Sequence, residues 1–124
     1  MKMIIGGSDS VNRKVVENTS VNILLSPEKG RNKDFMKSRN SGLNQVLCKL
    51  AAKNNVAIGF NFDDILNNND RVNILGRMML NVRLCNKYGV KMYVCNSQKD
   101  FRCDSDLKIF GRILGMKNFG IKRI

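Results

Sequence analysis

Two spacings of apolar residues alternate along the chain. Short apolar runs lie at residues 2–5, 21–25, 56–60 and 91–95. These runs are typical of buried strands, because they are too short for helices and are bounded by polar or turn residues. Between them, apolar residues recur three or four positions apart, which predicts helices. Strands that alternate with helices, without a hairpin signal or an internal repeat, predict a parallel sheet covered by helices.

The longest helix is predicted over residues 71–88. An apolar stripe marks its inner face: Val72, Leu75, Met78, Met79, Val82 and Cys85. Gly89 follows the stripe, as a glycine commonly does at a helix end. Four polar residues lie off the stripe: Arg77, Asn81, Arg83 and Lys87. A solvated helix face and an RNA contact explain these four equally well.

Three further helices are predicted from caps and spacing. The first is capped by Ser8 or Ser10 and carries Val11, Val15 and Val16. Another begins at a cap provided by Asn40 or Ser41. The last helix begins at Asp104 or Ser105. Its apolar residues are expected to face inward: Leu107, Ile109, Phe110, Ile113 and Leu114. Residues 121–124 are expected to form a basic tail with little room for further structure.

Residues 1–124 therefore predict a single α/β domain of alternating βα units, with about four parallel strands. Four strands cannot close an eight-stranded barrel, so the sheet is either small and open or part of a barrel. An open sheet leaves strand edges and an apolar surface that a partner must cover. We therefore expect self-association or dependence on a partner.

The net charge departs most strongly from an ordinary composition. The chain has 22 Lys and Arg residues against 10 Asp and Glu, a formal charge of +12. Such an excess repels within a compact body, and a polyanionic partner is the usual reason for it. A solubility device or an organism-wide basic bias would also explain the charge. We expect a nucleic-acid partner, with RNA ahead of DNA.

Basic residues concentrate in the segment between Pro27 and the next helix: Lys29, Arg31, Lys33, Lys37 and Arg39. Only Glu28 and Asp34 oppose them there. In a βαβ unit this loop lies at the carboxyl end of the sheet, where open α/β folds bind their ligands. We nominate these five residues as RNA-binding, together with three from the long helix: Arg77, Arg83 and Lys87.

Several kinds of catalytic site are excluded by composition. The chain has no histidine, so it lacks a His-activated nucleophile and the histidine ligands of metal clusters. Asp63-Asp64 is the one adjacent acidic pair, and before a short helix it is more typical of a cap than of a metal site. No cysteine pair has C-x-x-C spacing, which favours buried reduced thiols: Cys48, Cys85, Cys95 and Cys103. We predict no catalytic and no metal-binding residue.

The hydropathy of the chain predicts no membrane partner. No segment holds the roughly 18 consecutive apolar residues of a membrane helix. The apolar start of the chain is too short for the core of a signal peptide. We expect a cytoplasmic protein.

Short motifs over nearly the whole chain match one known family in order and spacing: Gly6-Gly7, Val15–Asn18, Ile23-Leu24, Pro27, Arg31, Ser41–Asn44, Val56–Phe60, Arg77, Asn81, Leu84-Cys85, Lys87–Val90, Ser97 and Leu114–Met116. With them, the sequence resembles ribonuclease P protein component 3, the archaeal counterpart of the thirty-kilodalton subunit of eukaryotic nuclear RNase P. Two features depart from the family. Its members are about twice as long, and many carry a histidine where Ser26 stands here.

The resemblance implies a TIM-barrel-like α/β fold without an active site of its own. It implies a non-catalytic subunit of the ribonuclease P holoenzyme, which helps the catalytic RNA to remove 5′ leaders from precursor tRNA. The implied partners are RNase P RNA, precursor tRNA, protein component 2 and the other RNase P proteins. The implied chemistry belongs to the RNA and its magnesium, with no cofactor bound by the protein. The alternatives are a general basic RNA-binding protein and, less in keeping with the residues, a metal-dependent barrel phosphoesterase.

Overall fold

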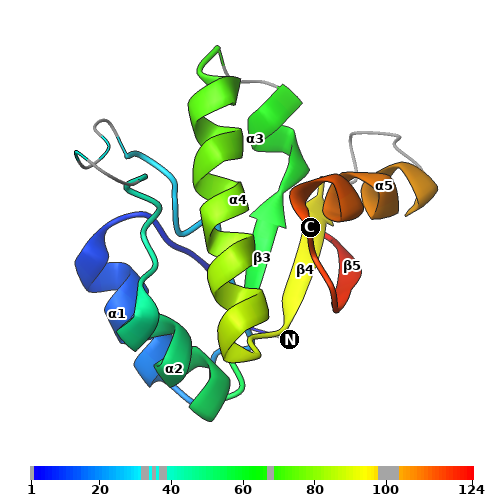
Figure 1. Cartoon of the computed structure of the whole chain (residues 1–124). Coiled ribbons are helices and arrows are strands. Elements are labelled where there is room, and N and C mark those ends of the chain that lie inside the picture. The colour runs from blue at the N-terminus through cyan, green and yellow to red at the C-terminus, as the bar shows by residue number, and fades with distance from the viewer. Residues whose placement is uncertain (1, 32–33, 35, 37–38, 67–68, 98–103) are drawn as a thin grey trace.

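Five parallel strands form one sheet in the structure, a computed structural model that describes residues 2–31, 34, 36, 39–66, 69–97 and 104–124 (Figure 1). They are β1 (Met3–Ile5), β2 (Ile23–Leu25), β3 (Ala57–Asn61), β4 (Met92–Asn96) and β5 (Phe119–Arg123). Their order in the sheet is their order in the chain, and each neighbouring pair is parallel. The structure thus confirms the predicted α/β class with alternating βα units.

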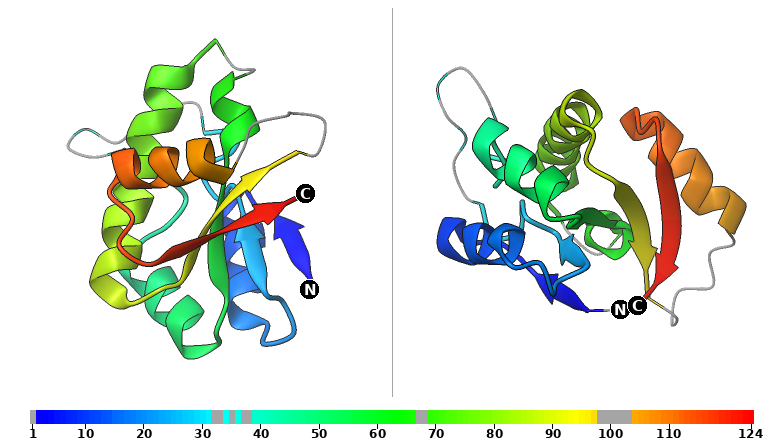
Figure 2. Two further views of the ribbon diagram at one scale, coloured as in Figure 1. Left: turned by 90° about the vertical axis from the view of Figure 1, so that its right-hand side faces the viewer. Right: turned by 90° about the horizontal axis from the view of Figure 1, so that it is seen from below.

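The helices lie around the outer side of the curved sheet, and both chain ends lie at its open side (Figure 2). Four helices have nine residues or more: α1 (Asp9–Glu17), α2 (Gln45–Lys53), α4 (Arg71–Tyr88) and α5 (Asp104–Leu114). A short helix, α3 (Phe62–Leu66), follows β3 directly. Since the sheet is open, it has the form of a partial TIM-barrel-like domain.

The fifth strand corrects the prediction of four strands and a basic tail. β5 pairs with β4 from Phe119 opposite Met92 to Arg123 opposite Asn96. Phe119 and Ile121 pack against the hydrophobic core from the edge of the sheet. This strand has few apolar residues and several basic neighbours, so its composition resembles a polar tail. Pairing with β4, which depends on tertiary structure, makes it a strand.

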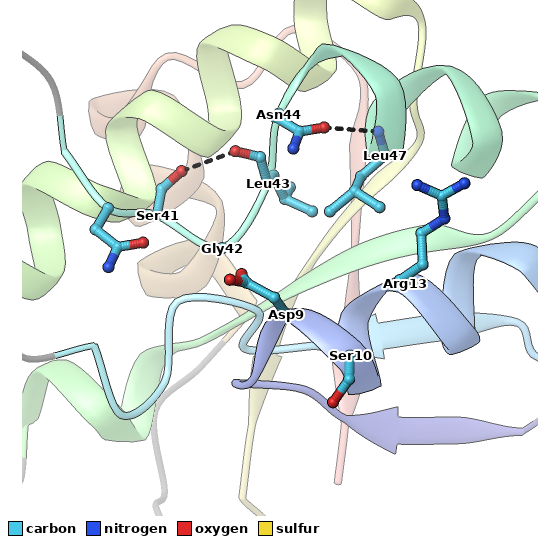
Figure 3. A pocket seen from close by; sticks show the side chains of 9 residues that line it. Asp9, Ser10, Arg13, Ser41, Gly42, Leu43, Asn44 and Leu47 are labelled. Carbon is cyan, nitrogen blue, oxygen red and sulfur yellow. Dashed lines mark hydrogen bonds between the residues drawn. The ribbon is translucent and has the colours of Figure 1, made fainter. Parts of the chain in front are cut away.

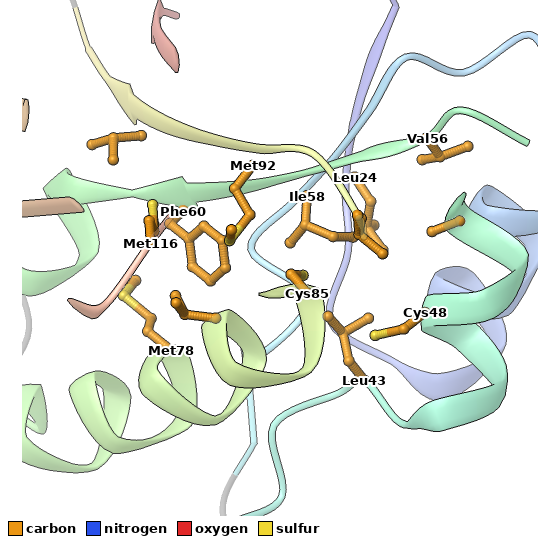
Figure 4. Packing of buried hydrophobic residues seen from close by; sticks show 14 of the residues in the cluster. Leu24, Leu43, Cys48, Val56, Ile58, Phe60, Met78, Cys85, Met92 and Met116 are labelled. Carbon is orange, nitrogen blue, oxygen red and sulfur yellow. The ribbon is translucent and has the colours of Figure 1, made fainter. Parts of the chain in front are cut away.

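The hydrophobic core lies between the sheet and the helices. Ile58, Phe60 and Met92 point from the sheet toward α4, where Met78 and Cys85 meet them (Figure 4). All five side chains are buried. This alternation of inward and outward residues along β3 is the period of two that a strand imposes.

Helix α4 has the predicted bounds but a different inner face. Its buried residues are Arg77, Met78, Asn81, Val82 and Cys85. Val72 and Met79, which the apolar stripe placed inside, are 75% and 45% exposed. Arg77 and Asn81 are buried instead, because their side chains donate hydrogen bonds to the loop between β2 and α2, which crosses the helix. Gly89 ends the helix in the left-handed conformation with φ of 72°, as predicted.

Two details of the other helices also differ from expectation. The cap of α2 is Asn44, whose Oδ1 accepts a hydrogen bond from the backbone N–H of Leu47 at 2.9 Å. On α5, Ile109 and Ile113 are exposed, while Leu107, Phe110 and Leu114 are buried as predicted. Helical spacing identified both helices but not how far each is rotated against the sheet.

The described cysteines are free and buried, as predicted: Cys48, Cys85 and Cys95. Cys103 lies outside the described residues. The thiols of Cys48 on α2 and Cys85 on α4 form a hydrogen bond, which together with burial raises the pKa of Cys85. In the described part of the chain, no helix is long and apolar enough to cross a membrane.

Truncation of Phe60 in this core is expected to lower the stability of the protein strongly. Phe60 is fully buried, and Phe60→Ala should lower the free energy of unfolding by about 3–5 kcal/mol, through lost transfer energy and a cavity. Urea unfolding followed by circular dichroism measures this change. Val46→Ala, at an exposed position of α2, is the control and should stay within about 0.5 kcal/mol. Equal effects at both positions would contradict the assignment of the core.

Candidate nucleic-acid interface

Residues 26–44 join β2 to α2, and their described part lies at the carboxyl end of the sheet, where the sequence placed its basic loop. Three buried side chains donate hydrogen bonds to the backbone carbonyls of this loop. Asn12 Nδ2 donates to the carbonyls of Pro27 and Gly42, both at 3.1 Å. Asn81 Nδ2 donates to Ser41 O at 2.9 Å, and Arg77 Nη1 donates to Arg31 O at 2.8 Å. The loop is therefore fixed from inside by α1 and α4.

Gly42 lets two parts of this loop meet. Its φ is +86°, a left-handed value at which the backbone of a residue with a side chain is strained. A Cβ at this position would also overlap the carbonyl oxygen of Pro27. The Asn12 amide bridges the two carbonyls at this crossing. Glycine is therefore required both by conformation and by space.

Asp34 accepts hydrogen bonds from two arginines and from the loop backbone. Its Oδ1 accepts from Arg77 Nε at 3.0 Å and from the backbone N–H of Asn40 at 2.8 Å. Its Oδ2 accepts from Arg39 Nη1 at 3.0 Å. The Asn40 N–H and then the two guanidinium groups hold the pKa of the Asp34 carboxyl below its ordinary value. The carboxylate is thus charged at neutral pH and binds both arginines.

The guanidinium of Arg39 also lies against α4. Its Nη1 donates to Asn73 Oδ1 at 2.8 Å. A Cβ on Gly76 would lie only 2.7 Å from Arg39 Nε, so the glycine leaves the space that the guanidinium occupies. Helix α4 therefore carries the loop on one of its faces.

The nominated residues of the interface fall into three groups. Arg31, Arg39 and Arg77 are engaged by the protein itself. The Arg77 side chain is 4% exposed, and that of Arg31 is 10% exposed and donates to Asp9 Oδ1 at 2.8 Å. Three others are exposed to solvent: Lys29, Arg83 and Lys87. Lys33 and Lys37 lie outside the described residues.

The sequence left two interpretations of Arg77 open, a solvated helix face and an RNA contact, and the structure instead buries its side chain. Its guanidinium is turned inward and paired, which suits it to hold the loop rather than to meet phosphates. Sequence reasoning also missed Asn12 and Asp34 as partners of the loop. Their signal was weak, because a buried asparagine in α1 looks like any polar helix residue until the crossing loop is known.

Glu28 is a buried carboxyl group at the same end of the sheet. It is 3% exposed, and neither carboxyl oxygen has a hydrogen-bond partner among the described residues. Burial raises its pKa to about 8, and the nearby Asp64 carboxylate adds to the rise. A cavity of about 300 Å³ adjoins it, lined also by Lys29, Gly30, Arg31, Asp64, Asp70, Ile74 and Arg77. Glu28 is therefore largely neutral at pH 7.

The acidic pair Asp63-Asp64 lies in the first turn of α3 but is not its cap. Asn61 Oδ1 accepts from the backbone N–H of Asp63 at 3.0 Å and takes that role. Asp64 Oδ2 accepts from Ser26 Oγ at 3.1 Å, and Asp63 Oδ2 from the backbone N–H of Ser97 at 3.2 Å. The pair thus ties neighbouring strand ends together. Within the described residues, no three His, Cys, Asp or Glu side chains gather as metal ligands.

A second cavity, of about 490 Å³, separates α1 from the end of the basic loop. Asp9, Ser10 and Arg13 line one side, and residues 40–44 with Leu47 line the other (Figure 3). Its polar groups are already used locally, since Arg13 pairs with Glu17. The cavity is a groove beside the loop, with carboxylate and guanidinium groups both present.

Fold and charge together define a class of protein: a partial TIM-barrel-like α/β domain with a large excess of positive charge. The family model described as RNase P subunit p30 matches residues 3–121, and the chain belongs to this family. The resemblance seen in the sequence is thereby confirmed. The match favours neither a general RNA-binding protein nor a metal-dependent phosphoesterase.

Individual relatives are similar over most of this chain. Ribonuclease P protein component 3 of Methanosarcina mazei is 37% identical over 120 residues, which cover 93% of this chain and 47% of that protein. The protein of the same name from Methanococcus maripaludis strain C5 is 32% identical over 113 residues, covering 87% of this chain and 46% of the relative. The chain spans about half the length of the curated relatives it matches.

A solved structure is similar in fold as well as in sequence. It is a chain in the cryo-EM structure of archaeal ribonuclease P with mature tRNA, with a TM-score of 0.77 and 31% identity. The match covers 92% of this chain and 48% of that chain. The partial barrel therefore corresponds to about half of the larger chain.

Removal of the Arg77 guanidinium should release the loop. Arg77→Met keeps most of the side-chain volume but removes one of the three donors of Asp34 and the side-chain donor of the Arg31 carbonyl, at an expected cost of about 2–4 kcal/mol in the free energy of unfolding. Urea unfolding gives the stability, and limited proteolysis reports opening of residues 29–39. The matched control is Arg83→Met, an exposed position on the same helix. A loss no larger than the control's would contradict the anchoring role.

Neutralisation of Glu28 should alter how stability depends on pH. The unfolded chain releases this proton near its ordinary pKa of 4.5, whereas the folded chain keeps it to about 8. The folded state therefore binds more protons in this window, and the free energy of unfolding falls as pH rises, by about 1.4 kcal/mol per pH unit.

Glu28→Gln imitates the neutral acid, so it should remove this fall and stabilise the protein most at the alkaline end of the window. Urea unfolding at several values between pH 5 and pH 8 measures the slope. Glu17→Gln makes the same charge change at an exposed position and is the control. An unchanged slope in Glu28→Gln would show that the carboxyl is already ionised in the folded protein.

Proposed function

We propose that the chain acts as a protein subunit of ribonuclease P, assisting a catalytic RNA in removing the 5′ leader from precursor tRNA. The match of residues 3–121 to the RNase P subunit p30 family carries this proposal. The similarity to a chain of archaeal ribonuclease P with mature tRNA supports it, since that chain belongs to an assembly with RNA. The net charge of +12 suits a polyanionic partner.

In this proposal the protein positions RNA and does not cleave it. The RNA and its magnesium ions carry the phosphodiester chemistry, and the protein binds no cofactor. The sequence supports this division of labour, because it offers no histidine for general acid–base catalysis. Its contribution is to neutralise phosphates, which adds affinity that weakens with salt.

The proposed partners are RNase P RNA, precursor tRNA, protein component 2 and the other RNase P proteins. The open sheet supports a protein partner or a second copy of the chain, because β1 and β5 each leave one edge without a neighbouring strand in the described sheet. Ile5 at the end of β1 is 56% exposed and would be covered by such a partner. The cytoplasmic location stays a prediction.

Among the nominated residues, the proposal favours Lys29 as the contact that the described part of the loop offers to RNA. It is exposed beside the cavity of Glu28. Arg31, Arg39 and Arg77 are instead hydrogen-bonded to other groups of the protein. Lys33 and Lys37 stay predicted contacts.

Cleavage of precursor tRNA by the cognate RNase P RNA tests the function directly. At limiting magnesium, with protein component 2 present, addition of the chain should raise kcat/KM for 5′-leader removal, because added positive charge replaces part of the magnesium requirement. The release of labelled leader is the measurement, and the chain without RNA is the control.

Each other outcome has a definite meaning. Cleavage by the chain without RNA would overturn the non-catalytic role. Salt-sensitive RNA binding without any gain in cleavage would instead assign the chain to general RNA binding.

A further inference from the structure

Carboxylates are confined almost entirely to one end of the sheet. In the part of the chain that the structure describes, each carboxylate side chain except Glu17 lies between the end of a strand and the first turn of the next helix of nine residues or more: Asp9, Glu28, Asp34, Asp63, Asp64, Asp70, Asp104 and Asp106. The sequence has no Asp or Glu at residues 35–62 or 71–99. Helices α2 and α4 therefore carry no negative side chain.

The facing helices α2 and α4 carry a cluster of cations instead. α2 packs against α4. Besides Arg71 at the start of α4, four basic residues are exposed on the pair: Lys49, Lys53, Arg83 and Lys87. Within each helix the two residues are four positions apart, so they share a face. We call these four residues, with Tyr88, the α2–α4 basic surface.

Tyr88 joins the two halves of this surface. The Nζ of Lys49 on α2 lies 5.8 Å from the centroid of the Tyr88 ring, and the Nζ of Lys87 lies 5.4 Å from it. One aromatic ring thus holds ammonium groups from two helices, which cation–π attraction favours. The two ammonium groups repel each other, and an anion between them would relieve that repulsion.

None of the four basic residues forms an ion pair with another described residue. The basic loop behaves differently, because Asp9 and Asp34 pair with its arginines. The charge available to a polyanion is therefore greater on the α2–α4 basic surface than at the described arginines of the loop. Lysine is depleted in protein–protein interfaces, so a surface with three lysines fits RNA better than it fits a protein.

We propose that the α2–α4 basic surface binds the phosphate backbone of RNA, as a contact region separate from the loop at the carboxyl end of the sheet. The proposal rests on the proposed function only for the identity of the RNA. Lys49 and Lys87 grip the backbone at Tyr88, and Lys53 and Arg83 extend the contact along the two helices.

The salt dependence of RNA binding tests the proposal. The double variant Lys49→Gln/Lys87→Gln removes two charges from exposed positions. The slope of log affinity against log salt for the cognate RNase P RNA should become shallower by about 1.4–1.8, since each lost phosphate contact removes about 0.7–0.9. Fluorescence anisotropy over a salt series measures this slope, and urea unfolding confirms that the variant is folded.

Two matched variants distinguish a local contact at the α2–α4 basic surface from the effect of the overall positive charge of the protein. Lys108→Gln/Arg112→Gln removes two exposed charges at the same spacing on α5, beside Asp104 and Asp106, and should change the slope far less. Lys49→Arg/Lys87→Arg keeps both charges and should restore the full slope. An equal loss in the α5 variant would overturn the proposal, since it would mean a diffuse charge effect.

Failure of this proposal differs from failure of the proposed function. If the wild-type chain stimulates cleavage while the Lys49/Lys87 variant binds RNA with an unchanged slope, the function stands and the surface does not bind RNA. Weaker association with protein component 2 in that case would make it a protein interface. If the wild-type chain does not stimulate cleavage but the variant binds the same RNA with a shallower salt dependence, the α2–α4 basic surface binds RNA and the proposed function is wrong.

Discussion

The backbone of the loop between β2 and α2 sets the main constraint on this structure. Its carbonyl groups are brought over the end of the sheet, where water cannot satisfy them fully, and a buried acceptor without a donor costs free energy. Asn12, Asn81 and Arg77 supply the donors. The burial of Arg77 and Asn81 turns a polar strip of α4 inward and leaves Val72 exposed. The orientation of the longest helix thus follows from the needs of a loop.

The same constraint decides where positive charge is free. Asp34 is held ionised between two arginines, and a third arginine reaches Asp9. These carboxylates therefore pair with arginines at the carboxyl end of the sheet, where they fix the loop between β2 and α2. Helix α4 holds the loop through Arg77 and Asn81, and neither α2 nor α4 carries an acidic residue. Lys49, Lys53, Arg83 and Lys87 lie exposed on these two helices and form no ion pair with another described residue, which makes a surface suited to a backbone of phosphates.

The open sheet links this chain to its larger relatives. Five strands follow one another in chain order and curve around one open side, with both chain ends on that side (Figure 2). The relatives are matched over about half their length. The edges of β1 and β5 are the places where further strands of a barrel would add. Contacts with RNA through α2 and α4 would leave these edges accessible to protein.

Local spacing by itself determined much of the fold. The bounds of α4, its glycine stop, the alternation of the first four strands with helices and the parallel sheet all followed from apolar periodicity and turn residues, which report short-range structure. The excess of charge likewise indicated a polyanionic partner. The fifth strand, the inward Arg77 and Asn81 and the raised pKa of Glu28 were decided only by tertiary structure. Each depends on a neighbour distant in sequence: β4 beside β5, a loop across α4, and a closed end of the sheet over Glu28. A polar residue in a helix looks the same in sequence whether it meets water or a buried carbonyl, and only the fold distinguishes the two.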